Sequence, residues 1–257
     1  MRTFPKKCLA IGSIVFLASG FAALPYANAQ ATSSIPFVGC ASDGQLGPRK
    51  APHGKTKVLT LPPELASKLA YYQAQEGSGV LAPVGWRCFS TYGSNGGSLF
   101  VAPQLIDGKL MFSDKWKGFS GPVVQISDSF GGTSGRFEVA SIIARVFPAH
   151  KAFVANVIAE GMQTAADFPS GPYPKDKLHY RSREAVEYET PPQTEGLGTR
   201  SRLQKSDKAV TGVEILSGSN EELNLVSLAI RLPQGAESLA RAIVQQTERE
   251  IAADPPN

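Results

Sequence analysis

The chain contains 257 residues, of which 42% are hydrophobic and 19% are charged, and this composition excludes collagen-like, coiled-coil and disordered proteins. The formal net charge is +4, but Arg2, Lys6 and Lys7 lie in an N-terminal segment that we expect to be removed and that contains no acidic residue. Without these three, 23 basic residues face 22 acidic ones. The near-neutral balance predicts no nucleic-acid partner.

Residues 1–29 show the order of parts found in a secretory signal peptide. Positive charges precede an uncharged run of 17 apolar and small residues from Cys8 to Leu24, and Ala27-Asn28-Ala29 then supplies small residues at a cleavage site. The alternative is an uncleaved membrane anchor, which needs about 20 mostly apolar residues. We therefore expect cleavage after Ala29, a mature protein in the periplasm or outside the cell, and no stable membrane span after cleavage.

The cysteine count agrees with export. Removal of the signal segment takes Cys8 away and leaves Cys40 and Cys88. In an oxidising compartment an isolated pair most simply forms one disulfide. The alternative, a reactive thiol, has no support from a C-x-x-C motif or from a histidine near either cysteine in the sequence. We expect a bridge that closes a loop of 49 residues.

The rest of the chain divides into an arm and a folded part. Residues 30–57 are rich in Gly, Pro, Ser and Ala and predict an irregular arm tethered by Cys40. Residues 58–257 predict a single α+β globular domain, with two lobes meeting near residue 170 as the alternative. A chain of this length buries enough surface for one good core.

Helical and strand patterns alternate irregularly from residue 58 onwards. A short strand over 58–61 is followed by a helix that starts at Pro62-Pro63-Glu64 and stops near Gly77. Two β-like runs around Asn95-Gly96 predict a hairpin with a bulge or a long loop. Short strands are expected over 110–112 and 123–126. Apolar residues at helical spacing predict helices over 137–147, ending at Pro148, and over 153–161.

The last third of the chain combines strands with one long helix. Period-two alternation predicts a single strand over 178–188 with one wet face. Residues 190–208 are polar and predict a lid or mobile loop. A hairpin follows over 210–232, with a bulge between Leu225 and Val226, where the apolar parity slips. An amphipathic helix spans 236–252. The fold class is thus α+β, a mostly antiparallel sheet built from hairpins with about four helices and one disulfide.

The common catalytic and metal-binding motifs are absent from the sequence. No G-x-S-x-G, H-E-x-x-H or zinc-spaced His/Cys cluster occurs, so we expect no metal and no cofactor. Asp128, Ser134 and His150, around the Gly-rich turn before the helix at 137, are the candidate members of a triad assembled from distant residues. The simpler interpretation is a turn, a helix cap and a surface histidine.

Two further groups are candidate ligand contacts. Trp86 and Tyr92 have the aromatic surface that stacks on a sugar or peptide, and the alternative is packing around Cys88. His179 and Arg181 are candidate anion contacts on the wet face of their strand, and the alternative is ion pairing with acidic residues such as Glu187.

Two hypotheses of function follow. The first, which we prefer, is an exported, non-catalytic binding or envelope-accessory protein whose partner is a small molecule, a glycan or an envelope protein. The second is a secreted hydrolase with a non-standard catalytic site. The geometry around Ser134 and the position of the deepest polar pocket discriminate between them.

Overall fold

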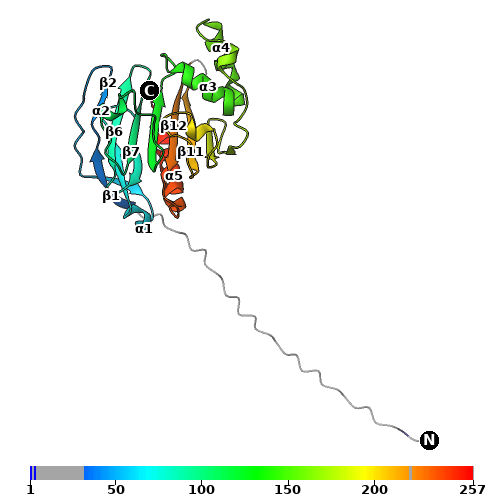
Figure 1. The fold of residues 1–257 in the computed structure, drawn as a ribbon. Helices are drawn as coiled ribbons and strands as arrows, with labels where there is room; N and C mark the ends of the chain where they lie inside the picture. Colours follow the sequence, from blue (N-terminus) through cyan, green and yellow to red (C-terminus); the bar gives the residue numbers. More distant parts are fainter. Residues whose placement is uncertain (2, 4–31, 220–221, 257) are drawn as a thin grey trace.

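The computed structural model of the chain describes residues 1, 3, 32–219 and 222–256. The expected signal segment therefore lies outside the described residues, apart from Met1 and Thr3. The described part is α+β with mostly antiparallel sheets, which confirms the expected fold class (Figure 1). Within it, the five α-helices, three of which have seven residues or more, are α1 (Pro63–Ala66), α2 (Gly108–Met111), α3 (Arg136–Val146), α4 (Lys151–Ala159) and α5 (Glu237–Ala253).

The strands form two sheets. The smaller sheet has the order β3-β1-β4-β5, with β1 at Thr32–Gly39, β3 at Thr56–Thr60, β4 at Leu69–Gln73 and β5 at Val80–Pro83. The larger sheet has the order β2-β6-β7-β8-β12-β11-β10-β9, and these strands span Ser42–Gly44, Arg87–Gly93, Gly96–Ala102, Val123–Ser129, Leu223–Arg231, Val210–Gly218, Ala185–Thr190 and Lys177–Tyr180 in that order. Neighbouring strands are antiparallel except in the pairs β1–β4 and β2–β6. The larger sheet combines strands from both sides of residue 170.

The larger sheet has a hydrophobic core on each face. One face packs against the smaller sheet and α5, and the other packs against α3, α4 and the loops around them (Figure 1). The strands in the middle of this sheet are therefore buried on both sides. In β12, Val226 and Leu228 point to the first core while Leu225 points to the second.

This double burial corrects the bulge expected between Leu225 and Val226. The pairing of β12 with β11 and with β8 runs through both residues without interruption. Apolar residues stand next to each other in the sequence because each face of the sheet has its own core, and no extra residue is inserted.

Two expectations for the N-terminal part are wrong. Residues 32–39 form β1, and 42–44 form β2, where an irregular arm was expected. The helix expected from Pro62 to Gly77 is a single turn, α1, followed by β4. Leu69 to Tyr72 are all buried, because β4 lies between β1 and β5 and is covered on both faces. A strand inside the sheet can bury every side chain of residues 69–72, whereas a helix over these residues would expose some of them to solvent.

Three local expectations also change. The strand expected at 110–112 is the helical turn α2, which the Asp107 carboxylate caps by accepting the Leu110 N–H at 2.8 Å. The hairpin at 87–102 has a two-residue connection, because Gly93 pairs directly with Gly96. The strand expected over 178–188 is the hairpin β9–β10. The alternation in the sequence continues across the turn, because Tyr180 pairs with Val186 and paired residues point to the same face.

The remaining helices and strands follow the expected pattern. The expected helices over 137–147, 153–161 and 236–252 correspond to α3, α4 and α5, and the hairpin over 210–232 corresponds to β11–β12. α3 buries Val139, Ile142 and Ile143 on one face and ends before Pro148, which cannot continue it.

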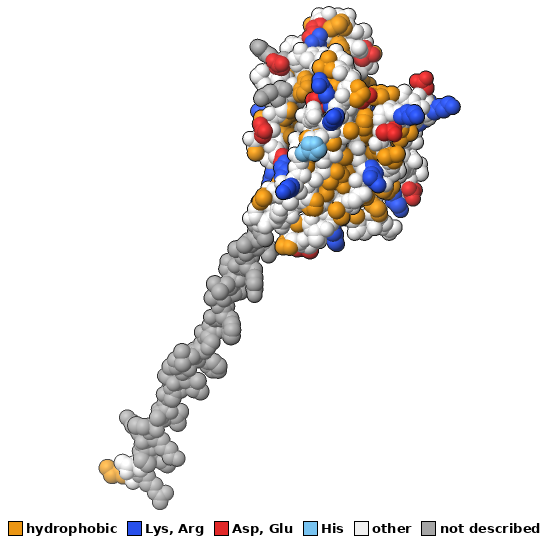
Figure 2. Space-filling model, turned by 90° about the vertical axis from the view of Figure 1, so that its left-hand side faces the viewer, with side chains coloured by type: hydrophobic (Ala, Val, Ile, Leu, Met, Phe, Trp, Pro, Cys, Tyr) orange, Lys and Arg blue, Asp and Glu red, His pale blue; other side chains and the backbone are white. Residues whose placement is uncertain are grey.

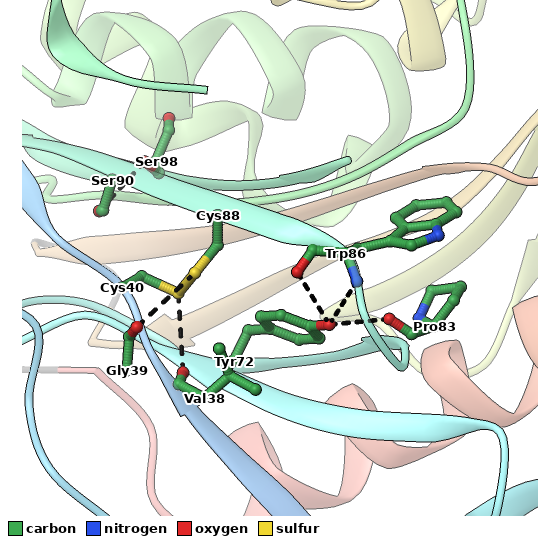
Figure 3. Close-up of a disulfide and its surroundings, with 9 residues drawn as sticks. All are labelled: Val38, Gly39, Cys40, Tyr72, Pro83, Trp86, Cys88, Ser90 and Ser98. Atoms are coloured by element: carbon green, nitrogen blue, oxygen red, sulfur yellow. Dashed lines mark hydrogen bonds between the residues drawn. A yellow bond between two sulfur atoms is a disulfide. The ribbon is translucent and has the colours of Figure 1, made fainter. Parts of the chain in front are cut away.

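Cys40 and Cys88 form the expected disulfide. Cys40 directly follows β1 of the smaller sheet, and Cys88 lies in β6 of the larger sheet, so the bond joins the two sheets (Figure 3). Beside it, the buried Tyr72 hydroxyl donates to the Pro83 carbonyl at 2.8 Å and accepts the Trp86 N–H at 3.1 Å (Figure 3). These contacts hold the start of β6 against the smaller sheet.

The surface shown in Figure 2 carries basic and acidic side chains interspersed among hydrophobic ones. This mixture agrees with the near-equal numbers of acidic and basic residues in the sequence after residue 29.

Candidate functional site

A row of polar side chains crosses the middle of the larger sheet. Ser98 on β7 pairs with Ser127 on β8, Ser127 pairs with Ser227 on β12, and Ser227 pairs with Glu214 on β11. Because directly paired residues point to the same face of a sheet, all four side chains face α3. Sheet residues usually pack apolar groups under a helix, so this row interrupts the core.

The row forms the floor of a cavity of about 550 Å³. We call this cavity the polar chamber. Its walls come from the tip of the β6–β7 hairpin, from α3 and from residues 197–203. The volume falls in the range of about 300–1,000 Å³ that is typical of small-molecule sites.

Residues 197–203, part of the loop expected over 190–208, are fastened to the rest of the molecule. Arg200 donates to the Glu138 carboxylate on α3 at 2.9 and 3.3 Å and to the Ser141 hydroxyl at 2.8 Å. At the start of this segment, the Leu197 N–H donates to Asp176 at 2.8 Å. Leu197 and Leu203 are buried. The segment therefore covers the chamber from a defined position.

Glu214 is the most unusual group in the chamber. Its side chain comes from the middle of an apolar strand and is only 2% exposed, and the Ser227 hydroxyl donates to it at 2.5 Å. Burial raises the pKa of Glu214 to about 8, because the charged form loses its hydration. A buried carboxyl with a raised pKa beside a cavity is a recognised sign of a functional site.

Gln125 on β8 lines the chamber and has an unused hydrogen-bonding atom. The side chain is 3% exposed, and its amide nitrogen donates to Ser127 at 2.9 Å and to Ser201 at 2.8 Å. Its carbonyl oxygen, Oε1, has no partner among the described residues. Buried polar atoms are nearly always hydrogen-bonded, so an unpaired oxygen beside a cavity indicates a place for a ligand atom.

The structure brings two of the residues singled out from the sequence to the chamber. Tyr92 borders it at the hairpin tip, but its side chain points to the opposite face of the sheet, because Tyr92 pairs with Gly97 and Gly97 pairs with Asp128. Its hydroxyl there donates to the Gly47 carbonyl at 2.5 Å. Ser134 lines it before α3. Trp86 lies away from the chamber, partly buried against the core shared with the smaller sheet.

The other sequence candidates lie elsewhere. His179 and Arg181 lie 3.9 and 3.4 Å from the Glu187 carboxylate. Asp128 points to the opposite face of the sheet, where its carboxylate accepts from the backbone N–H and hydroxyl of Ser78. His150 lies 3.6 Å from Glu184. Asp128, Ser134 and His150 thus point to different surroundings and do not form a triad.

Sequence reasoning missed Gln125, Glu214 and Ser227, and with them the floor of the chamber. Each is a polar residue with an apolar neighbour on both sides in its strand, as in the segment Val213-Glu214-Ile215. That pattern is a usable signal, because a polar side chain in a strand with two buried faces must find a partner or a cavity.

Within residues 32–219 and 222–256, the structure contains no cluster of His, Cys, Asp or Glu side chains that fits a metal ion. No helix in this part of the chain has the length and apolar character needed to cross a membrane. Comparisons with protein-family models, with curated proteins and with solved structures found no match to the chain.

Proposed function

We propose that this chain is an exported binding protein and that the polar chamber is its binding site for a small polar molecule. The observation that carries the proposal is the row from Ser98 to Glu214 along the floor of the cavity. Burying polar groups costs free energy unless they are hydrogen-bonded. A chamber with an unpaired Gln125 oxygen is therefore better explained by a ligand than by stability.

Export is supported by two independent features. Residues 1–29 have the composition and order of a signal peptide. The Cys40–Cys88 disulfide belongs to a class of bond that persists in oxidising compartments and is rare in reducing ones.

The test is a binding screen with a blocked chamber. Ser201→Trp places a large side chain at the chamber wall, and Ser170→Trp makes the same change at an exposed position outside the chamber. The chain is produced with its N-terminal segment, recovered from the exported fraction, and screened against small metabolites by ligand-observed NMR. We expect binding by the unmodified protein and by Ser170→Trp, and loss of binding in Ser201→Trp. Equal binding by all three would place the site elsewhere.

A hydrolase is the second candidate, and Glu214 is the observation that favours it. A carboxyl that stays protonated near neutral pH has the property required of a general acid. Chromogenic glycosides and esters provide the test. Turnover that is abolished by Glu214→Gln would favour the hydrolase, whereas binding without turnover favours the binding protein.

A further inference from the structure

We infer that the ligand of the polar chamber is a neutral, hydroxyl-rich molecule of the carbohydrate class. This inference rests on the proposed binding function. It follows from three properties of the chamber, namely its unused hydrogen-bonding capacity, the state of its charges and the aromatic residue Phe137 in its wall.

The hydrogen-bonding capacity left over in the chamber includes both a donor and an acceptor. Ser127 accepts from the Gln125 amide at 2.9 Å, and its hydroxyl lies 2.8 Å from that of Ser98. Each hydroxyl carries one hydrogen, and one of the two is used between the serines. The other has no acceptor among the described residues, and Gln125 Oε1 has no donor there. A ligand hydroxyl, which both donates and accepts, satisfies both needs.

The Ser201 hydroxyl, which binds the same Gln125 amide group, is a second donor. This hydroxyl accepts from Gln125 at 2.8 Å, and its own hydrogen has no acceptor among the described residues. Three neighbouring groups thus offer hydrogen bonds from the sheet and from the covering segment. A molecule with several adjacent hydroxyls matches this arrangement better than one with a single polar group.

Each charged group of the chamber that belongs to the described residues already has a partner, so none of them is a free counter-charge for a ligand. Arg200 is bound to Glu138 and Ser141, and Asp128 is bound to Ser78 on the other face of the sheet. Glu214 accepts from Ser227, and because its pKa is about 8 its carboxyl is mostly uncharged at neutral pH. A charged ligand would lose its hydration without meeting a free ion of opposite sign, which is costly. A neutral ligand avoids this cost.

The walls of the chamber add apolar contact area. Phe137, at the start of α3, lines it. Aromatic rings provide large apolar surfaces beside polar groups, and the C–H faces of a sugar ring pack well on such surfaces. The hydroxyls, the amide and the neutral carboxyl match the polar groups of a carbohydrate, and the aromatic ring of Phe137 matches its C–H face.

The experiment compares molecules of one size and different charge. Glucose, galactose and N-acetylglucosamine are titrated against the isotope-labelled exported protein, alongside gluconate and glucosamine as the charged counterparts. The reporters are the amide NMR signals of Gly97 and Gly198, which line the chamber. We expect at least one neutral sugar to shift both signals with a Kd at least tenfold lower than that of either charged compound.

Substitutions then test whether the free serine hydroxyls contribute to binding of the neutral sugar. Ser98→Ala removes one hydroxyl of the serine pair and should raise the Kd of the neutral sugar about tenfold. Ser170→Ala, outside the chamber, should leave it unchanged. Ser201→Ala gives a second reading at a position outside the sheet, in case Ser98→Ala disturbs β7.

Two unfavourable outcomes can be told apart. If gluconate or glucosamine shifts the chamber signals at lower concentration than every neutral sugar, the inference about the ligand class is wrong and the binding function stands. If no compound, in this panel or in the metabolite screen, shifts these signals, both the inference and the proposed function are overturned.

Discussion

The Ser227 hydroxyl on β12 donates a 2.5 Å hydrogen bond to the carboxyl group of Glu214, which lies directly opposite on β11. Glu214 is buried, and Ser227 is its hydrogen-bonding partner within the described side chains. Burial raises the pKa of Glu214 and the hydrogen bond from Ser227 lowers it, and the net rise leads to the first prediction.

Glu214 should make the protein less stable as the pH rises. Its pKa is about 8 in the folded chain and near its ordinary value of 4.5 when unfolded. Between pH 4.5 and 8 the Glu214 carboxyl is protonated in the folded chain and ionised in the unfolded chain. The contribution of this protonated carboxyl to the free energy of unfolding is therefore complete below pH 4.5 and is lost as the pH rises through 8. Glu214→Gln keeps the shape of the side chain but removes the carboxyl group that titrates. Its free energy of unfolding should exceed that of the unmodified protein at pH 9, by on the order of a few kcal/mol.

Urea denaturation at pH 5, 7 and 9 measures this difference. Glu64→Gln, on an exposed residue of α1, is the matched control and should preserve the pH dependence of the unmodified protein. Parallel pH profiles for the unmodified protein and Glu214→Gln would contradict the assignment of the raised pKa to this residue.

Arg200 should hold residues 197–203 against α3. Arg200→Gln removes the ion pair with Glu138 and leaves a shorter side chain, so the segment loses its link to the helix. We expect faster hydrogen exchange of the Gly198 and Leu203 amides, and weaker binding in the chamber. Arg183→Gln, at an exposed position in the β9–β10 turn, is the control and should change neither quantity. Unchanged exchange in Arg200→Gln would show that the segment is held by its other contacts.

Arg231 is a buried structural cation. Its side chain is 1% exposed and donates to the carbonyls of Phe119, at 3.0 Å, and of Gln204. It thereby joins the loop before β8 to Gln204, which directly follows the segment that covers the chamber. Arg231→Met leaves buried carbonyls without a donor and should lower the free energy of unfolding by about 2–4 kcal/mol. Chemical denaturation measures the loss, and Arg183→Met, an exposed counterpart, should cost less than about 0.5 kcal/mol.

The disulfide should contribute stability through the unfolded chain. Cys40 and Cys88 are 48 positions apart, and a loop of this size corresponds to about 4 kcal/mol in the chain-entropy account. Replacing both cysteines by alanine should lower the free energy of unfolding by up to that amount and leave the signals of the chamber in place. Titration of the denatured, unreduced protein should find neither thiol free. Two free thiols would contradict the bridge.

Local sequence patterns were sufficient for the elements that depend on neighbours along the chain. The spacing of Val139, Ile142 and Ile143 and the proline at 148 predicted α3, since helix periodicity and a helix breaker act within a few residues. The pairing of Cys40 with Cys88 followed from the count of cysteines that remain after residue 29.

Sequence patterns predicted the wrong secondary structure where pairing with strands distant in the sequence determines the conformation. Leu65, Leu69 and Tyr72 have helical spacing, yet Leu69 and Tyr72 lie in β4, because β1 and β5 offer hydrogen bonds and two covered faces. Propensity is a weak preference that such packing overrides.

The sequence by itself determined the α+β class, the long helices and the disulfide partners. The tertiary structure alone decided the polar chamber. Glu214, Ser227 and Ser127 come from three strands, and only the register between those strands sets them side by side under α3. The physical reason is that a strand's pattern tells which residues share a face, while cross-strand pairing, fixed by packing over long sequence distances, determines which residues meet.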